Sequence, residues 1–306
     1  MKRIGLAWLG AFFGGVVLAS AQVTVEIRLD QDQFLPGETI PAAVRITNRS
    51  GQTLALGDSD DWLTFSVERR DERESIVPKI GEVPVRGPFE LETSKIATKR
   101  VDLAPYFNFG TVGRYAVVAT LRIPGWDREI TSPPRVFQII NGTRMWEREF
   151  GLAATSGQPP ETRRYILQQA NYLRGQLRLY LRITDGAGLR TLKVLPIGTI
   201  VSFSRPEPQL DKSSNLHLLY QNGPRSFSYH VFNPDGEVVT DEIYDYLGSR
   251  PRLRVDDEGN VKVIGGVRRR TPAEIVGVSP TNAPPTGAPD KPDSPTDVPP
   301  PPDSQP

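Results

Sequence analysis

Alternation of apolar and polar residues is the main pattern in the first half of the chain. Every second residue is apolar from Val23 to Leu29, and the alternation resumes from Ile40 to Ile46. Successive side chains of a strand point to opposite faces, so each of these strands is predicted to bury one face. Turn clusters recur roughly every ten residues, as is typical of a β-sandwich. We therefore predict an all-β domain over residues 22–141.

A late strand of this domain carries a tyrosine signature. Tyr115 follows Gly113 and begins a run in which every second residue is apolar as far as Leu121. A tyrosine in this position often anchors an interstrand crossover through its hydroxyl. Together with the segments 34–38 (FLPGE) and 101–103 (VDL), the segment 112–115 (VGRY) resembles bacterial immunoglobulin-like domains of exported proteins. The resemblance implies a sandwich fold, which hosts adhesion, substrate binding and simple spacing alike.

The second half of the chain repeats itself at a spacing of 45 residues. Arg205-Pro206 recurs as Arg250-Pro251 (250 − 205 = 45), and the segment 215–218 recurs as 260–263. A period of roughly 40–50 residues indicates a unit of four short strands, the size of a propeller blade. We predict blade-like strands over residues 177–270, joined by turns such as 233–236 (NPDG), in which asparagine and glycine tolerate a left-handed backbone.

The segments 250–266 (RPRLRVDDEGNVKVIGG) and 216–239 (LHLLYQNGPRSFSYHVFNPDGEVV) resemble blades of secreted bacterial β-propellers of the sialidase or WD40-like kind. A propeller closes its ring with roughly 4–8 blades. This region holds strands for about two, so the resemblance implies no active site at a ring centre. We expect the strands of 177–203 to pair with those of 250–266, because this pairing completes two four-stranded sheets and covers their edges. The same pairing between two chains would give a dimer, and we favour the monomer.

Residues 142–176 are predicted to link the two regions. A helical stripe is formed by Ile166, Ala170, Leu173 and Leu177, which predicts a short helix within 161–174. An extended segment that pairs with the first blade is the alternative. Trp146 and Phe150 are expected to fill the joint between the domains, because either domain alone would expose apolar surface there.

The two ends of the chain carry signals of a different kind. Lys2 and Arg3 precede an apolar run that closes on Ala19-Ser20-Ala21, which predicts a secretory signal peptide cleaved after Ala21. At the other end, 12 of the 36 residues in 271–306 are proline. Such a segment has too few apolar residues to offset its ordering entropy, so we predict a disordered spacer. We therefore expect an exported protein, periplasmic or extracellular, with no stable membrane span after cleavage.

The amino-acid composition excludes some kinds of catalysis and argues against one class of partner. The chain has no cysteine, which rules out disulfides and thiol catalysis. Without residues 1–21, the chain has 35 basic and 36 acidic residues (37 − 2 against 36), a net charge of −1. This near-neutral balance argues against nucleic acid as a partner, because nonspecific binding to phosphates needs an excess of positive charge.

The histidines are the first candidates for a chemical site. The sequence has two, His217 and His230, on neighbouring predicted strands. Such a pair could bind a metal with Asp211 or Asp241 as the third ligand. However, His217 aligns with Lys262 in the repeat, which predicts a solvent-facing position instead. We therefore expect no bound metal, no cofactor and no catalytic residue.

Aromatic side chains are the remaining candidates for contact with a ligand. Six are singled out as candidate ligand-facing residues: Tyr220, Phe227, Tyr229, Tyr244, Tyr246 and Trp62. For Trp62 we favour packing on the core. The sequence predicts a non-catalytic exported protein of the cell envelope that acts by interaction or as a scaffold, with an envelope protein or a glycan as its partner. A carbohydrate- or peptide-binding accessory module is the alternative, and a hydrolase with an unrecognised site is the least favoured.

Overall fold

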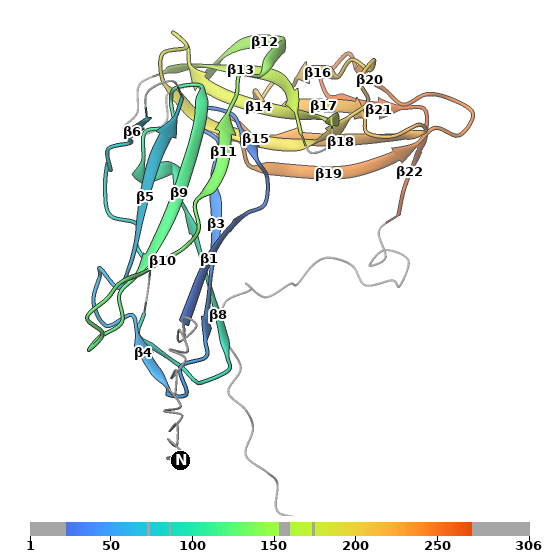
Figure 1. Cartoon of the computed structure of the whole chain (residues 1–306). Coiled ribbons are helices and arrows are strands. Elements are labelled where there is room, and N and C mark those ends of the chain that lie inside the picture. The colour runs from blue at the N-terminus through green and yellow to red at the C-terminus, as the bar shows by residue number, and fades with distance from the viewer. Residues whose placement is uncertain (1–22, 72–73, 86, 153–159, 173–174, 271–306) are drawn as a thin grey trace, which may run out of the picture.

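The computed structural model describes residues 23–71, 74–85, 87–152, 160–172 and 175–270. Within these ranges the chain is built from strands and has no α-helix, and its one 3₁₀ turn with described bounds is η1(Ala104–Tyr106), so the all-β prediction is confirmed. Figure 1 shows two β units, which we call the N-terminal unit (residues 23–139) and the C-terminal unit (143–268), the second lying across one end of the first. The predicted signal peptide and proline-rich tail lie outside the described residues.

The N-terminal unit has two main sheets. One is antiparallel, with the order β1(Val23–Leu29), β3(Pro41–Asn48), β8(Ile96–Asp102). The other has the order β2(Gln33–Phe34), β11(Arg135–Ile139), β9(Gly113–Leu121), β5(Leu63–Arg70), β6(Glu74–Ile76), with β10(Ile130–Thr131) also pairing with β9. A short pair, β4(Leu54–Leu56) and β7(Phe89–Leu91), completes the unit.

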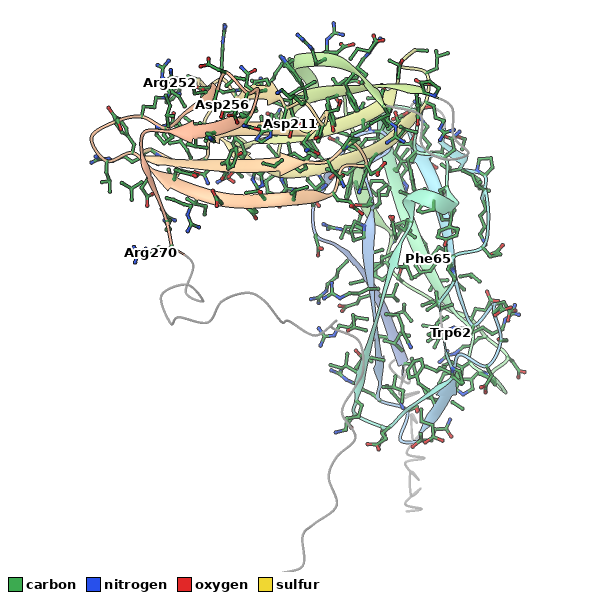
Figure 2. All side chains as sticks on the ribbon, turned by 180° about the vertical axis from the view of Figure 1, so that it is seen from behind. Trp62, Phe65, Asp211, Arg252, Asp256 and Arg270 are labelled. Atoms are coloured by element: carbon green, nitrogen blue, oxygen red, sulfur yellow. The ribbon has the colours of Figure 1, made fainter. Side chains whose placement is uncertain are left out.

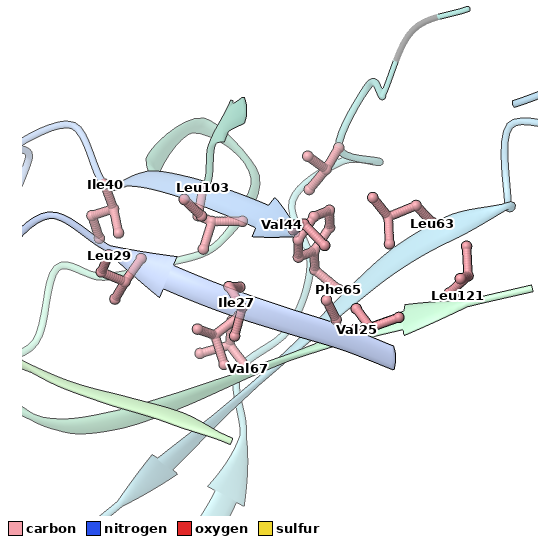
Figure 3. Close-up of a cluster of buried hydrophobic side chains, with 14 of the residues drawn as sticks. Val25, Ile27, Leu29, Ile40, Val44, Leu63, Phe65, Val67, Leu103 and Leu121 are labelled. Atoms are coloured by element: carbon pink, nitrogen blue, oxygen red, sulfur yellow. The ribbon is translucent and has the colours of Figure 1, made fainter. Parts of the chain in front are cut away.

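The inner faces of the two main sheets share one apolar core. β1 alternates buried and exposed residues along its whole length, as its sequence predicted. Ile27 of one sheet and Val67 of the other belong to the same cluster of buried side chains (Figure 3). Burial of a side chain of this size contributes about 1.5–3 kcal/mol. The shared core therefore holds the two sheets face to face.

Tyr115 anchors the loop that precedes its own strand, as predicted. Its hydroxyl donates a hydrogen bond of 2.7 Å to the carbonyl oxygen of Thr111. Its buried ring stacks on Phe137, with the ring centroids 5.7 Å apart. The side chain thus ties the loop to the core from which β9 starts.

The C-terminal unit consists of two larger sheets and a ribbon. The first sheet has the order β12(Thr143–Leu152), β13(Glu161–Asn171), β14(Leu177–Asp185), β15(Thr191–Ile200). The second has the order β16(Glu207–Leu210), β17(Leu216–Gln221), β18(Ser226–Phe232), β19(Val238–Asp245), β22(Val267–Arg268). The ribbon is β20(Arg252–Val255) with β21(Val261–Ile264). β12–β15 and β16–β19 are antiparallel meanders of four strands, so the propeller-like character of the repeat is confirmed.

These parts stack as three layers. Leu216 and Leu218 of β17 pack against Leu181 of β14, which joins the two sheets in one cluster of buried residues. The opposite face of β17 and β18 carries a second cluster, which the ribbon covers with Leu253 and Val263. We call this second cluster the outer core. All residues of β18 except the first are therefore buried.

The helix predicted within 161–174 is wrong, because β13 is extended through Asn171. Along β13 the alternation decides the structure: Tyr165 and Leu167 turn toward the buried cluster, and both neighbours, β12 and β14, supply backbone partners. The helical stripe had counted Leu173, which lies outside the described residues. The interval expected to be a linker thus supplies two strands of the first sheet.

Two further expectations for the C-terminal half need correction. Phe150 stacks on Tyr165 with centroids 4.2 Å apart, inside the C-terminal unit, so it does not fill the joint between the units. The strands of 177–203 do not pair with those of 250–266: β14 and β15 complete their sheet with β12 and β13, and β20 and β21 pair with each other. The exposed edge that motivated the predicted closure is covered by strands that precede it in the chain.

Candidate binding groove at the joint of the two units

A single turn of the N-terminal unit plugs into the C-terminal unit. Leu35, in the turn between β2 and β3, is 1% exposed and forms a cluster with Ala170, Tyr180 and Val194. The turn closes through a hydrogen bond of 3.0 Å from the backbone nitrogen of Glu38 to the carbonyl of Leu35. The sequence marked this segment only through the motif FLPGE and did not predict the contact of Leu35 with the second half of the chain. A leucine at the tip of a turn was the available signal, since an apolar tip needs a partner that buries it.

A series of hydrogen-bonded polar side chains lies beside the buried Leu35. The carboxylate of Glu38 is 2% exposed and accepts hydrogen bonds from the backbone nitrogen of Leu35 (2.8 Å) and the amide of Gln31 (2.7 Å). The amide oxygen of Gln31 in turn accepts a bond of 2.7 Å from Arg178 of the C-terminal unit. Burial raises the pKa of Glu38 above its ordinary value, although these hydrogen bonds and Arg178 oppose the rise.

Arg182 adds a direct bond across the joint. Its guanidinium donates to the carbonyl oxygen of Pro36 (2.8 Å) and to the side chains of Gln168 (2.9 Å) and Thr191 (3.0 Å). Burial lowers the pKa of Arg182 from its ordinary value. A half-buried arginine needs partners for its donors. Gln168 and Thr191 hold the guanidinium within the C-terminal unit, and the bond to Pro36 links it to the N-terminal unit.

Beside the joint lies an open groove of about 640 Å³, which we call the joint groove. Its floor is formed by β2, β9 and β11, and its wall by the end of β13. Its polar side chains include those of Gln33, Arg114, Arg135, Gln138 and Asn171. Clefts between structural units are common ligand sites, because two surfaces contribute groups to one ligand.

The polar groups of the joint groove differ in how freely they can bind a ligand. Gln33 donates to Gln138 across neighbouring strands (3.2 Å), and Arg135 forms an ion pair with Asp32. The side chain of Arg114 has no ion-pair partner among the described residues, and it is exposed. Arg114 is therefore the free cation of this surface, as far as the structure describes it.

Tyr172 forms an aromatic wall of the joint groove. The guanidinium carbon of Arg178 lies 3.5 Å from the centroid of its ring, a cation–π contact. Arg178 also bonds Gln31, so the position of Tyr172 is coupled to the hydrogen-bonded polar side chains of the joint. The groove thus combines a positioned ring with amide and guanidinium donors, which can bind a polar ligand but provide no evident nucleophile.

Most of the candidate ligand-facing aromatics do not reach the surface, and for Trp62 packing on the core was the favoured prediction. The structure buries Trp62, Tyr220, Phe227 and Tyr229, each no more than 7% exposed. Trp62 packs in the core of the N-terminal unit and donates to the carbonyl of Val85 (3.1 Å). The other three face either the buried cluster between the sheets or the outer core. Both clusters form between strands whose stacking the sequence did not predict.

The last two predicted aromatics lie nearer the surface. Tyr244 is half-buried and borders the outer core. Tyr246 is 39% exposed, and the guanidinium of Arg225 lies 5.8 Å from its ring centroid. The six predicted residues therefore do not converge on one surface.

The two histidines point to opposite faces of the second sheet. His217 pairs in register with Val231, and His230 pairs with Leu218, an offset of one residue. His217 contacts the hydroxyl of Tyr229 (2.7 Å), whereas the ring of His230 stacks on Tyr220 with centroids 5.8 Å apart. Both are buried, so the predicted solvent-facing position of His217 is wrong.

A metal site built on both histidines is excluded by this geometry, because the sheet separates the two rings. Within the described ranges, no group of three or more ligand-type side chains is placed to hold a metal ion. Burial lowers the pKa of His230 from its ordinary value, although Asp241 opposes the shift.

The fold and the groove define a class: an all-β protein of two units, locked by a buried turn, with an open polar groove at the joint. No protein-family model and no curated protein matches the chain. Among the residues that the structure describes, no helix has the length and apolar character to cross a membrane.

Two solved structures are similar to parts of this chain. The first is Spo0M, a sporulation control protein from Bacillus subtilis, at 15% identity, covering 85% of this chain and 94% of that protein, with a TM-score of 0.29. The second is AvmM, which catalyses macrocyclization in alchivemycin A biosynthesis, at 13% identity, covering 40% of this chain and 91% of that protein, with a TM-score of 0.26. Scores this low carry no argument about function.

Proposed function

We propose that this chain is an exported, non-catalytic interaction protein of the cell envelope, and that its partner protein binds at the joint groove. The observation that carries the proposal is the groove itself, an open surface built from both units beside a buried joint. Because the joint is fixed by Leu35 and by the bonds of Arg178 and Arg182, the groove is organised before a partner arrives. Such preorganisation lowers the entropy cost of binding.

Export is supported by the sequence rather than by the described residues. Residues 1–21 have the pattern of a secretory signal peptide, and the chain has no cysteine that an oxidising compartment would modify. We also propose that the N-terminal unit is an immunoglobulin-like sandwich. The two sheets around one core and the anchor of Tyr115 on Thr111 support this assignment.

A specific observation favours glycan binding as the second candidate. The joint groove has the amide side chains of Gln33, Gln138 and Asn171 in its lining, and it has Tyr172 at its wall. Amides both donate and accept hydrogen bonds, so they match the hydroxyl groups of sugars, and an aromatic ring supplies an apolar face.

A pull-down from envelope extract, set beside a glycan array, tests both candidates. The bait is the full-length chain, in its native form and as Arg114→Ala, which removes the free cation of the groove. The matched control is Arg100→Ala, an exposed arginine on the opposite sheet. We expect Arg114→Ala to weaken capture of a partner by about fivefold, near 1 kcal/mol, and the control to bind normally.

The outcomes separate the two functions. A captured protein that depends on Arg114 supports the interaction role. Glycan binding that depends on Arg114 supports the glycan-binding role instead. If neither binding depends on Arg114 or on Gln138→Ala, the joint groove is not the binding site, and the proposal is wrong.

A further inference from the structure

A second groove lies in the C-terminal unit, at a distance from the joint. It has a volume of about 440 Å³, and we call it the arginine groove. Its lining includes Phe203, Ser204, Arg205, Glu207, Arg250 and Arg252. Figure 2 shows Arg252 at the end of the C-terminal unit that points away from the N-terminal unit, where Trp62 and Phe65 lie.

The internal repeat builds this groove. Arg205-Pro206 of one copy and Arg250 of the other line the same groove, although the two arginines are 45 residues apart (250 − 205 = 45). Pro251 is buried, which holds Arg250 and Arg252 on either side of a fixed point. Gly265 lets the chain after β21 pass close to the backbone of Arg250, because a Cβ at Gly265 would lie 2.6 Å from the carbonyl oxygen of Arg250.

The charges of the arginine groove are unbalanced. The side chains of Arg205, Arg250 and Arg252 are exposed, and none forms an ion pair among the described residues. The one carboxylate of the groove, Glu207, accepts a hydrogen bond of 3.1 Å from the backbone nitrogen of Leu253. The guanidinium of Arg250 lies 5.2 Å from the ring centroid of Phe227, which orients it without neutralising it.

Two further residues of the groove lack the partners that their chemistry requires. Ser204 is only 7% exposed, and its buried side-chain oxygen has no hydrogen-bond partner among the described residues. An unsatisfied buried hydroxyl costs about 1–3 kcal/mol. The ring of Phe203 is 88% exposed, an unusual position for a large apolar side chain beside three cations.

We propose that the arginine groove binds an acidic peptide segment of a partner protein that also carries an apolar residue. Arginine matches carboxylates through paired N–H donors, so Arg205, Arg250 and Arg252 account for the acidic residues of the ligand. Phe203 accounts for the apolar residue, and an aromatic side chain among arginines is the composition of a protein-binding hot spot. A free oxyanion would leave Phe203 without a role.

Peptide binding at the arginine groove rests on the proposed interaction function, but its residues are not those of the joint groove. The probe is a fluorescein-labelled peptide of glutamate, aspartate and leucine, and its neutral counterpart has glutamine and asparagine at the acidic positions. Fluorescence anisotropy measures the affinity of each for the full-length chain. We expect binding of the acidic peptide alone.

Single substitutions test the named residues. Arg205→Gln and Arg252→Gln should each weaken binding by about tenfold, and Phe203→Ser should weaken the acidic peptide that contains leucine more than one without it. The matched control is Arg254→Gln, which removes the same charge two residues further along β20 from a side chain outside the groove. It should stay within about twofold of the native chain, because a solvated distant charge contributes little.

Several results would overturn the inference. Equal binding of the neutral peptide, or an equal loss in Arg254→Gln, would show that only net charge acts. Displacement by sodium phosphate, at an ionic strength where sodium chloride has no effect, would assign the groove to a free oxyanion. Because Arg114→Ala should leave peptide affinity unchanged, failure here and failure of the joint groove are distinguishable.

Discussion

At the scale of single residues, Glu38 shows how the joint between the units depends on an uncommon environment. Its carboxylate is 2% exposed, yet it holds the turn through Leu35 and reaches Arg178 through Gln31. Burial disfavours the charged form, and this effect outweighs the hydrogen bonds that favour it, so the pKa of Glu38 is raised. The joint is therefore built on a group that binds its proton more tightly in the folded chain than in the unfolded chain.

Replacement of Glu38 by glutamine should change how stability depends on pH. Between the ordinary carboxyl pKa of 4.5 and the raised value, the folded chain binds more protons than the unfolded chain. The contribution of Glu38 to the free energy of unfolding is therefore largest below this window and falls as the pH rises through it. Denaturant titrations of the native chain and Glu38→Gln should show their difference drifting by up to about 1.4 kcal/mol per pH unit. A difference that stays constant with pH would contradict the assignment.

At the scale of elements, hairpin turns do more than connect strands. The turn between β18 and β19 is closed by Asn233, whose side-chain oxygen accepts from the backbone nitrogens of Asp235 (3.1 Å) and Glu237 (2.8 Å). Arg163 of the neighbouring sheet forms an ion pair of 2.7 Å with Asp235. The turn thus packs on the first sheet of the C-terminal unit and helps to hold the two sheets together.

Gly236 of this turn should not tolerate a side chain. Its φ is +74°, and a Cβ would lie 2.8 Å from the Cδ1 of Ile183. The matched control is Gly125, with φ of +77° and no neighbour within 4 Å of a Cβ. We expect Gly125→Ala to lower the unfolding free energy by about 1–2 kcal/mol, the cost of the left-handed backbone alone. Gly236→Ala should lose roughly 1–3 kcal/mol more by overpacking, and equal losses in denaturant titrations would contradict the packing of this turn.

At the scale of the whole molecule, the layered C-terminal unit replaces the closed ring of a propeller. The second sheet is covered on one face by the first sheet and on the other by the β20–β21 ribbon. Burial of both faces explains why β17 and β18 lack the alternation of buried and exposed residues that is seen along β1. The ribbon is also the element that carries Arg252 to the arginine groove.

Two neighbouring residues of the ribbon test this layer. Val263 packs on the outer core, whereas Ile264 is 45% exposed on the other face of the same strand. Val263→Asp should lower the unfolding free energy by about 2–4 kcal/mol, because it places a carboxylate against an apolar cluster. Ile264→Asp should change it by about 0.5 kcal/mol or less. If thermal and denaturant melts of the two variants coincide, the ribbon does not form a third layer.

Features that depend on neighbouring residues were predicted from the sequence, whereas the pairing of strands was not. Alternation predicted β1, β3 and β9, and the Gly113-Arg114-Tyr115 segment predicted the hydroxyl anchor, because these features depend on residues close together in the chain. The pairing of β14 with β13 was only an alternative, since a strand of period two can accept several neighbours. The helix within 161–174 was wrong because tertiary pairing overrode a weak helical stripe.

The candidate sites divide in the same way. The 45-residue repeat marked Arg205 and Arg250 as equivalent, but only the folded chain places both at one groove. By itself the sequence determined an all-β chain, its strand faces and most of its turns, because a period of two and turn chemistry act over a few residues. Which strands pair, which aromatic rings are buried on both sides of a sheet, and where the two grooves open were decided by long-range packing, since these depend on surfaces brought together only in the tertiary structure.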